Sequence, residues 1–193
     1  EVEARYSVLI DVEGTYDKDW GAKLGIDNDA LIYIQPSSLN EAIDMTQVLL
    51  ANPEVGFLFF DSMIAIGCDA EIEKSMEDEQ MAVNARFWNK SVRKLRSSMN
   101  SNIGVTLMVV NSAYEKVGLV FGNPEKVKNG KGMSLAKSVS LKLNANKEIK
   151  AKIGGSGKDV TVGRNLSIKN MKNKFGVPFR DHSFYFSFIG ITI

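Results

Sequence analysis

The sequence predicts an α/β fold, with a mostly parallel, twisted sheet flanked by helices and a partly antiparallel C-terminal section. Residues 6–11 (YSVLID) and 55–62 (VGFLFFDS) are short, almost continuously apolar runs with Asp at or near the end. Such runs are typical of strands buried on both faces of a parallel sheet. A helical pattern lies between them, which gives the order strand, helix, strand of a right-handed crossover. Later segments alternate polar and apolar residues instead, as antiparallel strands do.

The first helix is predicted within residues 37–52, after a third apolar strand at residues 30–35 (ALIYIQ). Ser38 and Glu41 have the spacing of a capping box, which marks a helix N-terminus. The helix is expected to end at Asn52-Pro53, because proline cannot continue it. The apolar residues that recur at helical intervals are Ala42, Met45 and Leu49.

A long amphipathic helix is predicted from Met81 to Met99. Its apolar residues follow a 4,3,4,3,4 spacing and are expected in the core. They are Met81, Ala85, Trp88, Val92, Leu95 and Met99. A different face of the helix carries Arg86, Lys90 and Arg93 at i, i+4 and i+7. This row of cations is suited to follow a phosphate backbone.

The C-terminal half is predicted to begin with a buried strand at residues 105–111 (VTLMVVN). Alternation then indicates strands of a partly antiparallel section within residues 134–144, 160–173 and 183–193. Residues 154–160 (GGSGKDV) are interpreted as a hairpin turn between two of these strands. They do not make a phosphate-binding loop, because the first glycine is missing at the required distance and a strand pattern follows.

The composition favours a single domain over residues 1–193, since the chain has 193 residues of which 44% are hydrophobic. No apolar run approaches the roughly 20 residues that span a bilayer, and the first residues lack the order of a signal peptide. We therefore expect a soluble, cytoplasmic protein. Cys68 and His182 are each the only residue of their kind, which excludes an internal disulfide and argues against metal or redox sites built on Cys or His.

The charge is distributed unevenly along the chain. From Glu115 to Lys174 there are 14 Lys or Arg and 4 Asp or Glu, a net charge of +10, which leaves −9 for the rest. Such a segment is either a solvated lysine-rich face or a surface for a polyanion, and charge alone favours neither.

Asp61 is a candidate Mg²⁺-binding residue and Glu13 a candidate catalytic residue at one edge of the predicted sheet. Open α/β sheets bind ligands at the carboxyl ends of their strands, where an Asp can hold Mg²⁺ in nucleotide-hydrolysing enzymes. Glu13, two residues past the first strand, would share that crevice and activate an attacking water. Many strands also end in an Asp that caps the next helix, and the chain lacks the Gly-Lys phosphate loop of such sites. The pattern alone does not specify a nucleotide site.

Three blocks of sequence match a known family in order and spacing. They are FFDSMIAIGCDAEIEKSMEDEQMAVNARFWNKSVRKL, KVGLVFGNPE and MKNKFGVPF. Through these blocks the chain resembles the ATPase core of bacterial RecA recombinases, the DNA strand-exchange proteins, from about Ser7 to Gly190. The divergence elsewhere is typical of a phage-encoded or otherwise remote member. The resemblance implies a RecA-like ATPase core that uses ATP and Mg²⁺, forms a helical homo-oligomeric filament on single-stranded DNA, and pairs that strand with homologous double-stranded DNA in recombination and repair.

The resemblance implies roles at the edge of the sheet. Asp61 corresponds to the Asp that holds Mg²⁺ through water, with Ser62 beside it, and Glu13 corresponds to the water-activating glutamate. Asn111 and Ser112 stand where the family has a glutamine that senses the γ-phosphate and couples ATP to DNA. A serine is too short for that reach, so the coupling is either weakened or carried by Asn111.

The resemblance also implies contacts with other parts of the nucleotide. Asp17 and Trp20 fall where the family contacts adenine and stacks on it, with Trp20 in place of the usual tyrosine. Lys172 and Lys174 match a catalytic lysine pair that reaches the phosphates of the neighbouring subunit's ATP, each acting like an arginine finger supplied in trans. Hydrolysis would then depend on filament assembly. Without the resemblance, both are best interpreted as surface lysines on a strand.

The two DNA loops of the family fall on residues 73–82 and about 113–132. Apolar side chains there are inserted at stretched base steps, glycines allow close approach to phosphate, and lysines add counterion-releasing charge. The glycines disfavour the alternative of a short buried strand at residues 117–121. The candidate DNA-binding residues are Met81, Arg86, Lys90, Arg93, Lys116, Val117, Gly118, Phe121, Gly122, Asn123, Asn129, Gly130 and Lys131.

The phosphate-binding loop of the family is expected just upstream of Glu1. The alternative is a catalytically inactive RecA relative that acts as a DNA-binding or filament scaffold. A different P-loop ATPase, such as a helicase or a circadian-clock type hexamer, would share the strand that ends in Asp but is not expected to share GLVFGNPE.

Overall fold

The computed structural model describes residues 5–63, 77–115, 125–127, 130–152 and 159–188. The chain divides into two compact units. The first comprises Glu1–Tyr16 and Asp27–Ala136, and the second comprises Asp17–Ile26 and Lys137–Ile193. The single domain over residues 1–193 stays a prediction.

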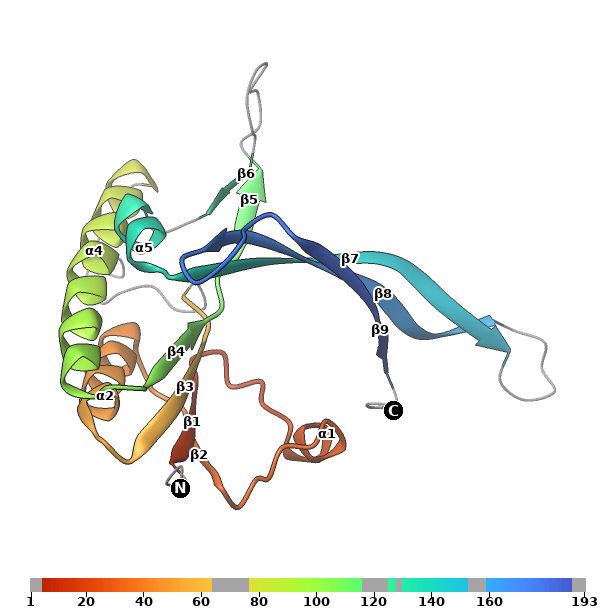
Figure 1. Cartoon of the computed structure of the whole chain (residues 1–193), viewed down its shortest axis with the longest axis horizontal. Coiled ribbons are helices and arrows are strands. Elements are labelled where there is room, and N and C mark those ends of the chain that lie inside the picture. The colour runs from red at the N-terminus through yellow and green to blue at the C-terminus, as the bar shows by residue number, and fades with distance from the viewer. Residues whose placement is uncertain (1–4, 64–76, 116–124, 128–129, 153–158, 189–193) are drawn as a thin grey trace. The chain divides into compact units, whose positions relative to one another are not determined.

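The first unit is built on a four-stranded parallel sheet with the order β2-β1-β3-β4 (Figure 1). Its strands are β1 (Tyr6–Asp11), β2 (Leu31–Ile34), β3 (Val55–Asp61) and β4 (Thr106–Val109). The apolar runs predicted as strands are thus confirmed, and β4 is shorter than the expected 105–111. The two central strands end side by side, because Asp11 lies opposite Asp61 in the register. Both carboxyl groups therefore belong to one edge of the sheet.

Helix α2 (Leu39–Ala51) begins where the capping pattern predicts. The Ser38 hydroxyl accepts a hydrogen bond from the Glu41 backbone N–H at 3.2 Å. The Glu41 carboxylate reaches back one residue further than a capping box requires, and accepts from the Ser37 N–H at 2.7 Å and from the Ser37 hydroxyl. These bonds lower the pKa of Glu41. The buried residues of α2 are Leu39, Ala42, Ile43, Thr46 and Leu50, so Met45 and Leu49 lie at the border of the buried face.

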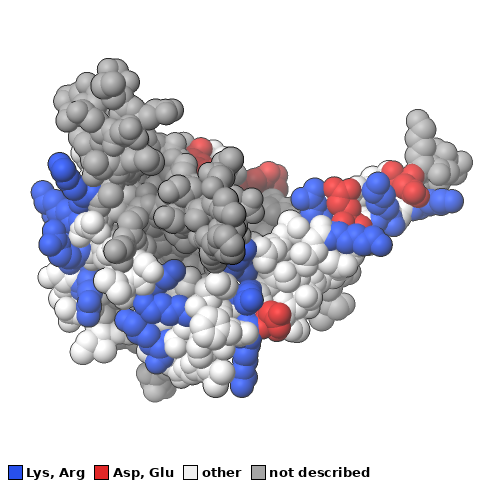
Figure 2. All heavy atoms as spheres, turned by 90° about the horizontal axis from the view of Figure 1, so that it is seen from above, with Lys and Arg blue, Asp and Glu red and all other residues white. Residues whose placement is uncertain are grey.

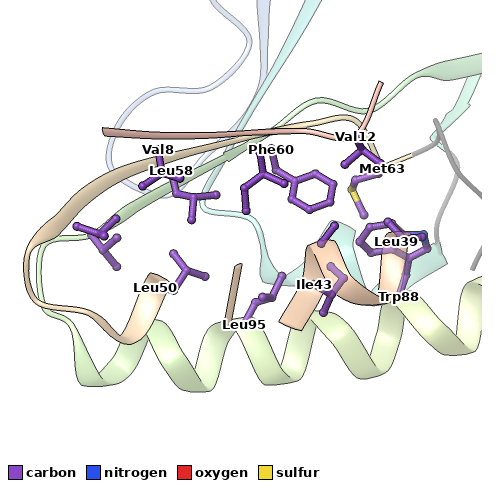
Figure 3. Close-up of a cluster of buried hydrophobic side chains, with 14 residues drawn as sticks. Val8, Val12, Leu39, Ile43, Leu50, Leu58, Phe60, Met63, Trp88 and Leu95 are labelled. Carbon is purple, nitrogen blue, oxygen red and sulfur yellow. The ribbon is translucent and has the colours of Figure 1, made fainter. Parts of the chain in front are cut away.

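The long predicted helix is α4 (Glu77–Ser101). With α2 it lies along one face of the sheet, where Leu58 and Phe60 point toward the helices (Figure 3). Trp88 is 1% exposed and meets Phe60 edge-on, with ring centroids 6.4 Å apart. Val92 and Leu95 are buried and Met99 packs against the same core. The predicted apolar stripe is confirmed from Trp88 to Met99, whereas the side chains of Met81 and Ala85 lie outside the described part.

The segment after β4 corrects two expectations from the sequence. Part of the expected loop at 113–132 is regular structure, because β5 (Ala113–Glu115) pairs antiparallel with β6 (Glu125–Val127) and α5 (Gly130–Ala136) follows. The strand expected within 134–144 starts only at Val139, since residues 134–136 belong to α5. The physical reason is packing: α5 lies on α4, and its Met133 packs against the hydrophobic core.

The second unit contains a three-stranded antiparallel sheet with the order β7-β8-β9. The strands are β7 (Val139–Lys152), β8 (Asp159–Asn173) and β9 (Asp181–Ser187), and the predicted turn between β7 and β8 lies outside the described residues except at its end. The unit also holds a short helix that the sequence did not predict, α1 (Lys18–Lys23). A parallel sheet covered by helices and a separate antiparallel sheet confirm the predicted α/β fold. Within the described ranges, no helix is both long enough and apolar enough to cross a membrane.

Candidate functional site

Asp11, at the end of β1, organises the turn that carries Glu13. It is 2% exposed, yet its carboxylate is fully used as an acceptor. One oxygen accepts from the Glu13 N–H at 3.2 Å and the Gly14 N–H at 2.8 Å, and the other accepts from the Tyr16 N–H at 2.8 Å and the Tyr33 hydroxyl at 3.1 Å. Burial and the bond to Asp11 raise the pKa of Tyr33. The backbone on both sides of Glu13 is therefore fixed by one carboxylate.

Two further contacts hold the same turn. The Tyr16 hydroxyl donates to Asn28 Oδ1 at 2.7 Å, and its ring lies 5.5 Å from that of Tyr33. Gly14 has a φ of 68°, and the space a side chain would need there is filled by the amide of Gln35. Glycine is required at this position on both grounds.

Glu13, the predicted catalytic carboxylate, and Asp61, the predicted Mg²⁺-binding carboxylate, are brought to one edge of the sheet. The Ser62 hydroxyl donates to Glu13 Oε1 at 2.7 Å, so the residue after β3 holds the side chain from the turn after β1. Burial raises the pKa of Asp61, and the nearby charges of Glu13 and Asp11 raise it further. This edge therefore carries negative charge that a cation would neutralise.

The donor set at this edge fits Mg²⁺ bound together with phosphates. Magnesium commonly takes one or two protein carboxylates and keeps several waters or phosphate oxygens. No group of three Asp, Glu, His or Cys within the described ranges is able to hold a metal by itself. Asp61 and the neighbouring Ser62 are the residues that would face the ion.

The segment with Asn111 and Ser112 reaches the same edge. The Val110 N–H donates to the Phe60 carbonyl at 3.0 Å, and the Met63 N–H donates to the Val110 carbonyl at 3.1 Å. Asn111 is half-buried and Ser112 is exposed. The two sensor candidates thus follow β4 at the place where β3 ends in Asp61.

The remaining predicted nucleotide residues belong to the second unit. Asp17 is the N-cap of α1 and accepts from the Trp20 N–H at 3.0 Å, while Trp20 meets Phe186 of β9 edge-on at 6.4 Å. Lys172 lies on β8 opposite Ser140 of β7, and Lys174 follows the end of β8. Asp17 and Trp20 thus both have structural contacts within the second unit.

A groove of about 540 Å³ runs between α4 and α5 in the first unit. Of the predicted cation row, Arg86 and Arg93 line this groove and Lys90 does not. The other lining residues are Asn89, Val92 and Arg96 of α4 and Gly132, Leu135 and Ala136 of α5. All three arginines are exposed, and none has an ion pair or hydrogen bond to another described residue. In Figure 2, lysine and arginine side chains gather on the side of this unit that α4 forms, at the left.

Arg96 and Asn89 are groove residues that the sequence analysis missed. The signal was present, because Arg86, Asn89, Arg93 and Arg96 are spaced 3, 4 and 3 residues apart and so share one helical face. The predicted row included Lys90 in place of Asn89, and Lys90 lies to the side of the face that lines the groove. Gly132 of α5 also contributes, since a side chain there would collide with the Asn89 amide.

Several predicted DNA-binding residues lie outside the described part of the chain. They are Lys116, Val117, Gly118, Phe121, Gly122, Asn123 and Asn129, together with the first part of the loop at 73–82. Gly130 and Lys131 are described, and they form the first turn of α5 where a loop was expected. Met81 lies in α4.

Comparison with known proteins gives one consistent family. A family model described as the RecA N-terminal domain matches residues 2–191. Protein RecA of Mesomycoplasma hyopneumoniae (strain 7448) is 35% identical over 174 residues, which cover 90% of this chain and 50% of the relative. Protein RecA of Nocardia farcinica (strain IFM 10152) is 33% identical over 178 residues, or 92% of this chain and 49% of the relative. The chain thus spans about half the length of these relatives. With a family model matched over almost its whole length and an α/β fold that agrees, the chain belongs to the RecA family.

Proposed function

We propose that this chain is the ATPase core of a recombinase that acts in DNA recombination and repair. In this proposal it forms ATP-dependent helical filaments on single-stranded DNA and promotes strand exchange with a homologous duplex. The observation that carries the proposal is the groove on α4, where three arginines line up without a partner among the described residues. A guanidinium group binds phosphate through two parallel hydrogen bonds, so such a row favours a polyanion.

The geometry of the row suits a strand better than a single small anion. Arg86 and Arg96 are ten residues apart on one helix, about 15 Å along its axis at 1.5 Å per residue. That length covers several phosphates, since one strand of a duplex carries one phosphate per about 3.4 Å of helix axis. Contacts to phosphates do not depend on the base sequence, as a protein that pairs any homologous strands requires.

The edge of the sheet that carries Glu13 and Asp61 would supply the residues for ATP hydrolysis. Glu13, held by Ser62, would orient and deprotonate the attacking water, while Asp61 and Ser62 would hold Mg²⁺, which when bound neutralises charge on the phosphates. Asn111 would sense the γ-phosphate. Asp17 and Trp20 would contact adenine, and Lys172 and Lys174 would reach the nucleotide of the neighbouring subunit.

The DNA part of the proposal is tested by the salt dependence of single-stranded DNA binding. For single strands the slope of log K against log salt changes by about 0.7 for each phosphate contact. Arg86→Ala and Arg93→Ala should each weaken binding and flatten the slope by about that amount. Lys94→Ala is the matched control, because Lys94 lies on the same helix but faces Asp44 at 3.6 Å. Equal slopes in all three variants and the wild type would remove the groove from DNA binding.

The enzymatic part is tested in the full-length protein. Glu13→Gln should bind ATP yet hardly hydrolyse it, with and without single-stranded DNA, because an amide cannot accept the proton. Normal turnover by this variant would exclude Glu13 as the base. A wild-type protein that binds DNA cooperatively but never hydrolyses ATP would support the alternative of a filament scaffold.

A further inference from the structure

Lys137 holds an unusual position at the start of the three-stranded sheet. It comes directly after α5 and two residues before β7, and its side chain is half-buried. Its ammonium group donates to the Ser140 hydroxyl at 2.8 Å. The charged end of the side chain is therefore held at the first residues of β7.

Two other lysines reach the same end of the sheet. Ser140 lies directly opposite Lys172 in the β7–β8 register. The backbone N–H of Lys174 donates to the carbonyl of Ser138 at 3.0 Å. Lys137, Lys172 and Lys174 thus all lie at one end of the β7–β8 strand pair.

The electrostatics of Lys137 show that its charge is not compensated. Burial lowers the pKa of Lys137, and the positive charge of Lys172 lowers it further. The hydrogen-bond partner, Ser140, is neutral. Among the residues that the structure describes, no carboxylate forms an ion pair with Lys137. A half-buried cation beside a second cation costs stability unless an anion binds there.

We propose that Lys137 forms, with Lys172 and Lys174, a binding site for the terminal phosphates of a nucleoside triphosphate. The inference deepens the proposed function, on whose nucleotide chemistry it rests, and adds Lys137 and Ser140 to the two lysines recognised in the sequence. Lys137 donates one hydrogen bond to a phosphate oxygen, and Ser140 orients its ammonium group. In a filament, the triphosphate would come from the neighbouring subunit.

The arrangement favours a compact anion over a DNA strand. The three lysines lie at one end of the β7–β8 strand pair, whereas the arginines of α4 form a row along a helix. Further along β7 and β8 the basic side chains are interspersed with acidic ones. Figure 2 shows this in the part that extends to the right. There Arg164 pairs with Glu148 at 2.9 Å. The positive charge at the Lys137 end is therefore local.

Titration with inorganic tripolyphosphate tests the site directly. In a protein with ¹³C-labelled lysine, the side-chain resonances of Lys137 and Lys172 should shift with one common dissociation constant. The Lys137→Met variant should bind tripolyphosphate about 5- to 10-fold more weakly, the effect of losing one charge-assisted hydrogen bond at a partly exposed site. Lys150→Met is the matched control, since Lys150 lies ten residues beyond Ser140 on β7, and its binding should equal that of the wild type.

Each outcome decides between the alternatives. Shifts at Lys172 without Lys137, or equal weakening by both variants, would overturn the inference. So would a single-stranded oligonucleotide that shifts the Lys137 resonance more strongly than tripolyphosphate at equal phosphate concentration. Because the titration needs neither DNA nor hydrolysis, its failure leaves the salt-slope test of the α4 groove untouched, and the two proposals fail separately.

Discussion

Asp11→Asn should destabilise the first unit, although the substitution preserves the shape of the side chain. The Asp11 carboxylate is 2% exposed and accepts from three backbone N–H groups and one tyrosine hydroxyl. An asparagine offers one oxygen acceptor, and its other terminal atom becomes an NH₂ donor. Two of the four donors must then face a donor.

The magnitude follows from the less costly of the two amide orientations. With the oxygen toward Glu13 and Gly14, both of their bonds survive, and the Tyr33 hydroxyl can rotate to accept from the new NH₂ group. The Tyr16 N–H can only donate and now faces another donor. One charge-assisted hydrogen bond to a buried group is therefore lost, at a cost of about 1.5–3 kcal/mol. The surviving bonds also lose their ionic partner. We expect the free energy of unfolding to fall by about 2–4 kcal/mol.

Urea denaturation at pH 7, followed by circular dichroism, measures this change. Asp44→Asn is the matched control, because Asp44 is 70% exposed and its ion pair with Lys94 spans 3.6 Å. The control should differ from the wild type by less than about 0.5 kcal/mol. An Asp11→Asn variant within the same margin would refute the view that this carboxylate holds the turn around Glu13.

Three other predictions concern the core, the second sheet and Lys137. Trp88→Ala should lower the free energy of unfolding by about 3–5 kcal/mol in the same denaturation assay, because the side chain is 1% exposed. Gly163→Ala should weaken the β8–β9 pair and lower the melting temperature, since the new methyl group would meet backbone and the ring of Tyr185; an unchanged melting temperature would contradict this packing. Lys137→Met should be at least as stable as the wild type at pH 7. Burial and Lys172 lower the pKa of Lys137, so the folded state binds the proton less tightly than the unfolded chain. The advantage of the variant should shrink as the pH rises toward 10.5, the ordinary lysine value, and a less stable variant at pH 7 would assign Lys137 a structural role.

The elements predicted correctly are those whose signal is local. The runs at 6–11 and 55–62 are almost continuously apolar, and the α4 stripe repeats over several turns, so neighbours in the sequence carry enough information. The expectation that both faces are buried was wrong for β3, because Phe57 is 37% exposed. The placement of Asp61 and Glu13 could also be predicted, because parallel strands bring their carboxyl ends to one edge of the sheet.

The features that were missed depend on residues far apart in the sequence. Helix α1 has only six residues, and its Trp20 packs on Phe186 of β9. Helix α5 is fixed by packing on α4. The meeting of Lys137 with Lys172 depends on the β7–β8 register, which no periodicity reveals.

Tyr16 makes residues 17–26 a separable insert. Its backbone N–H is bound by Asp11 where the chain leaves the first unit, and its hydroxyl binds Asn28 just after the chain returns. Contacts of Tyr16 therefore hold both ends of this ten-residue segment close together in the first unit. The entropy cost of closing the loop is borne by these contacts and does not depend on the residues within it. Exchanging this insert for a short glycine linker, or for the equivalent piece of another family member, would leave the parallel sheet intact.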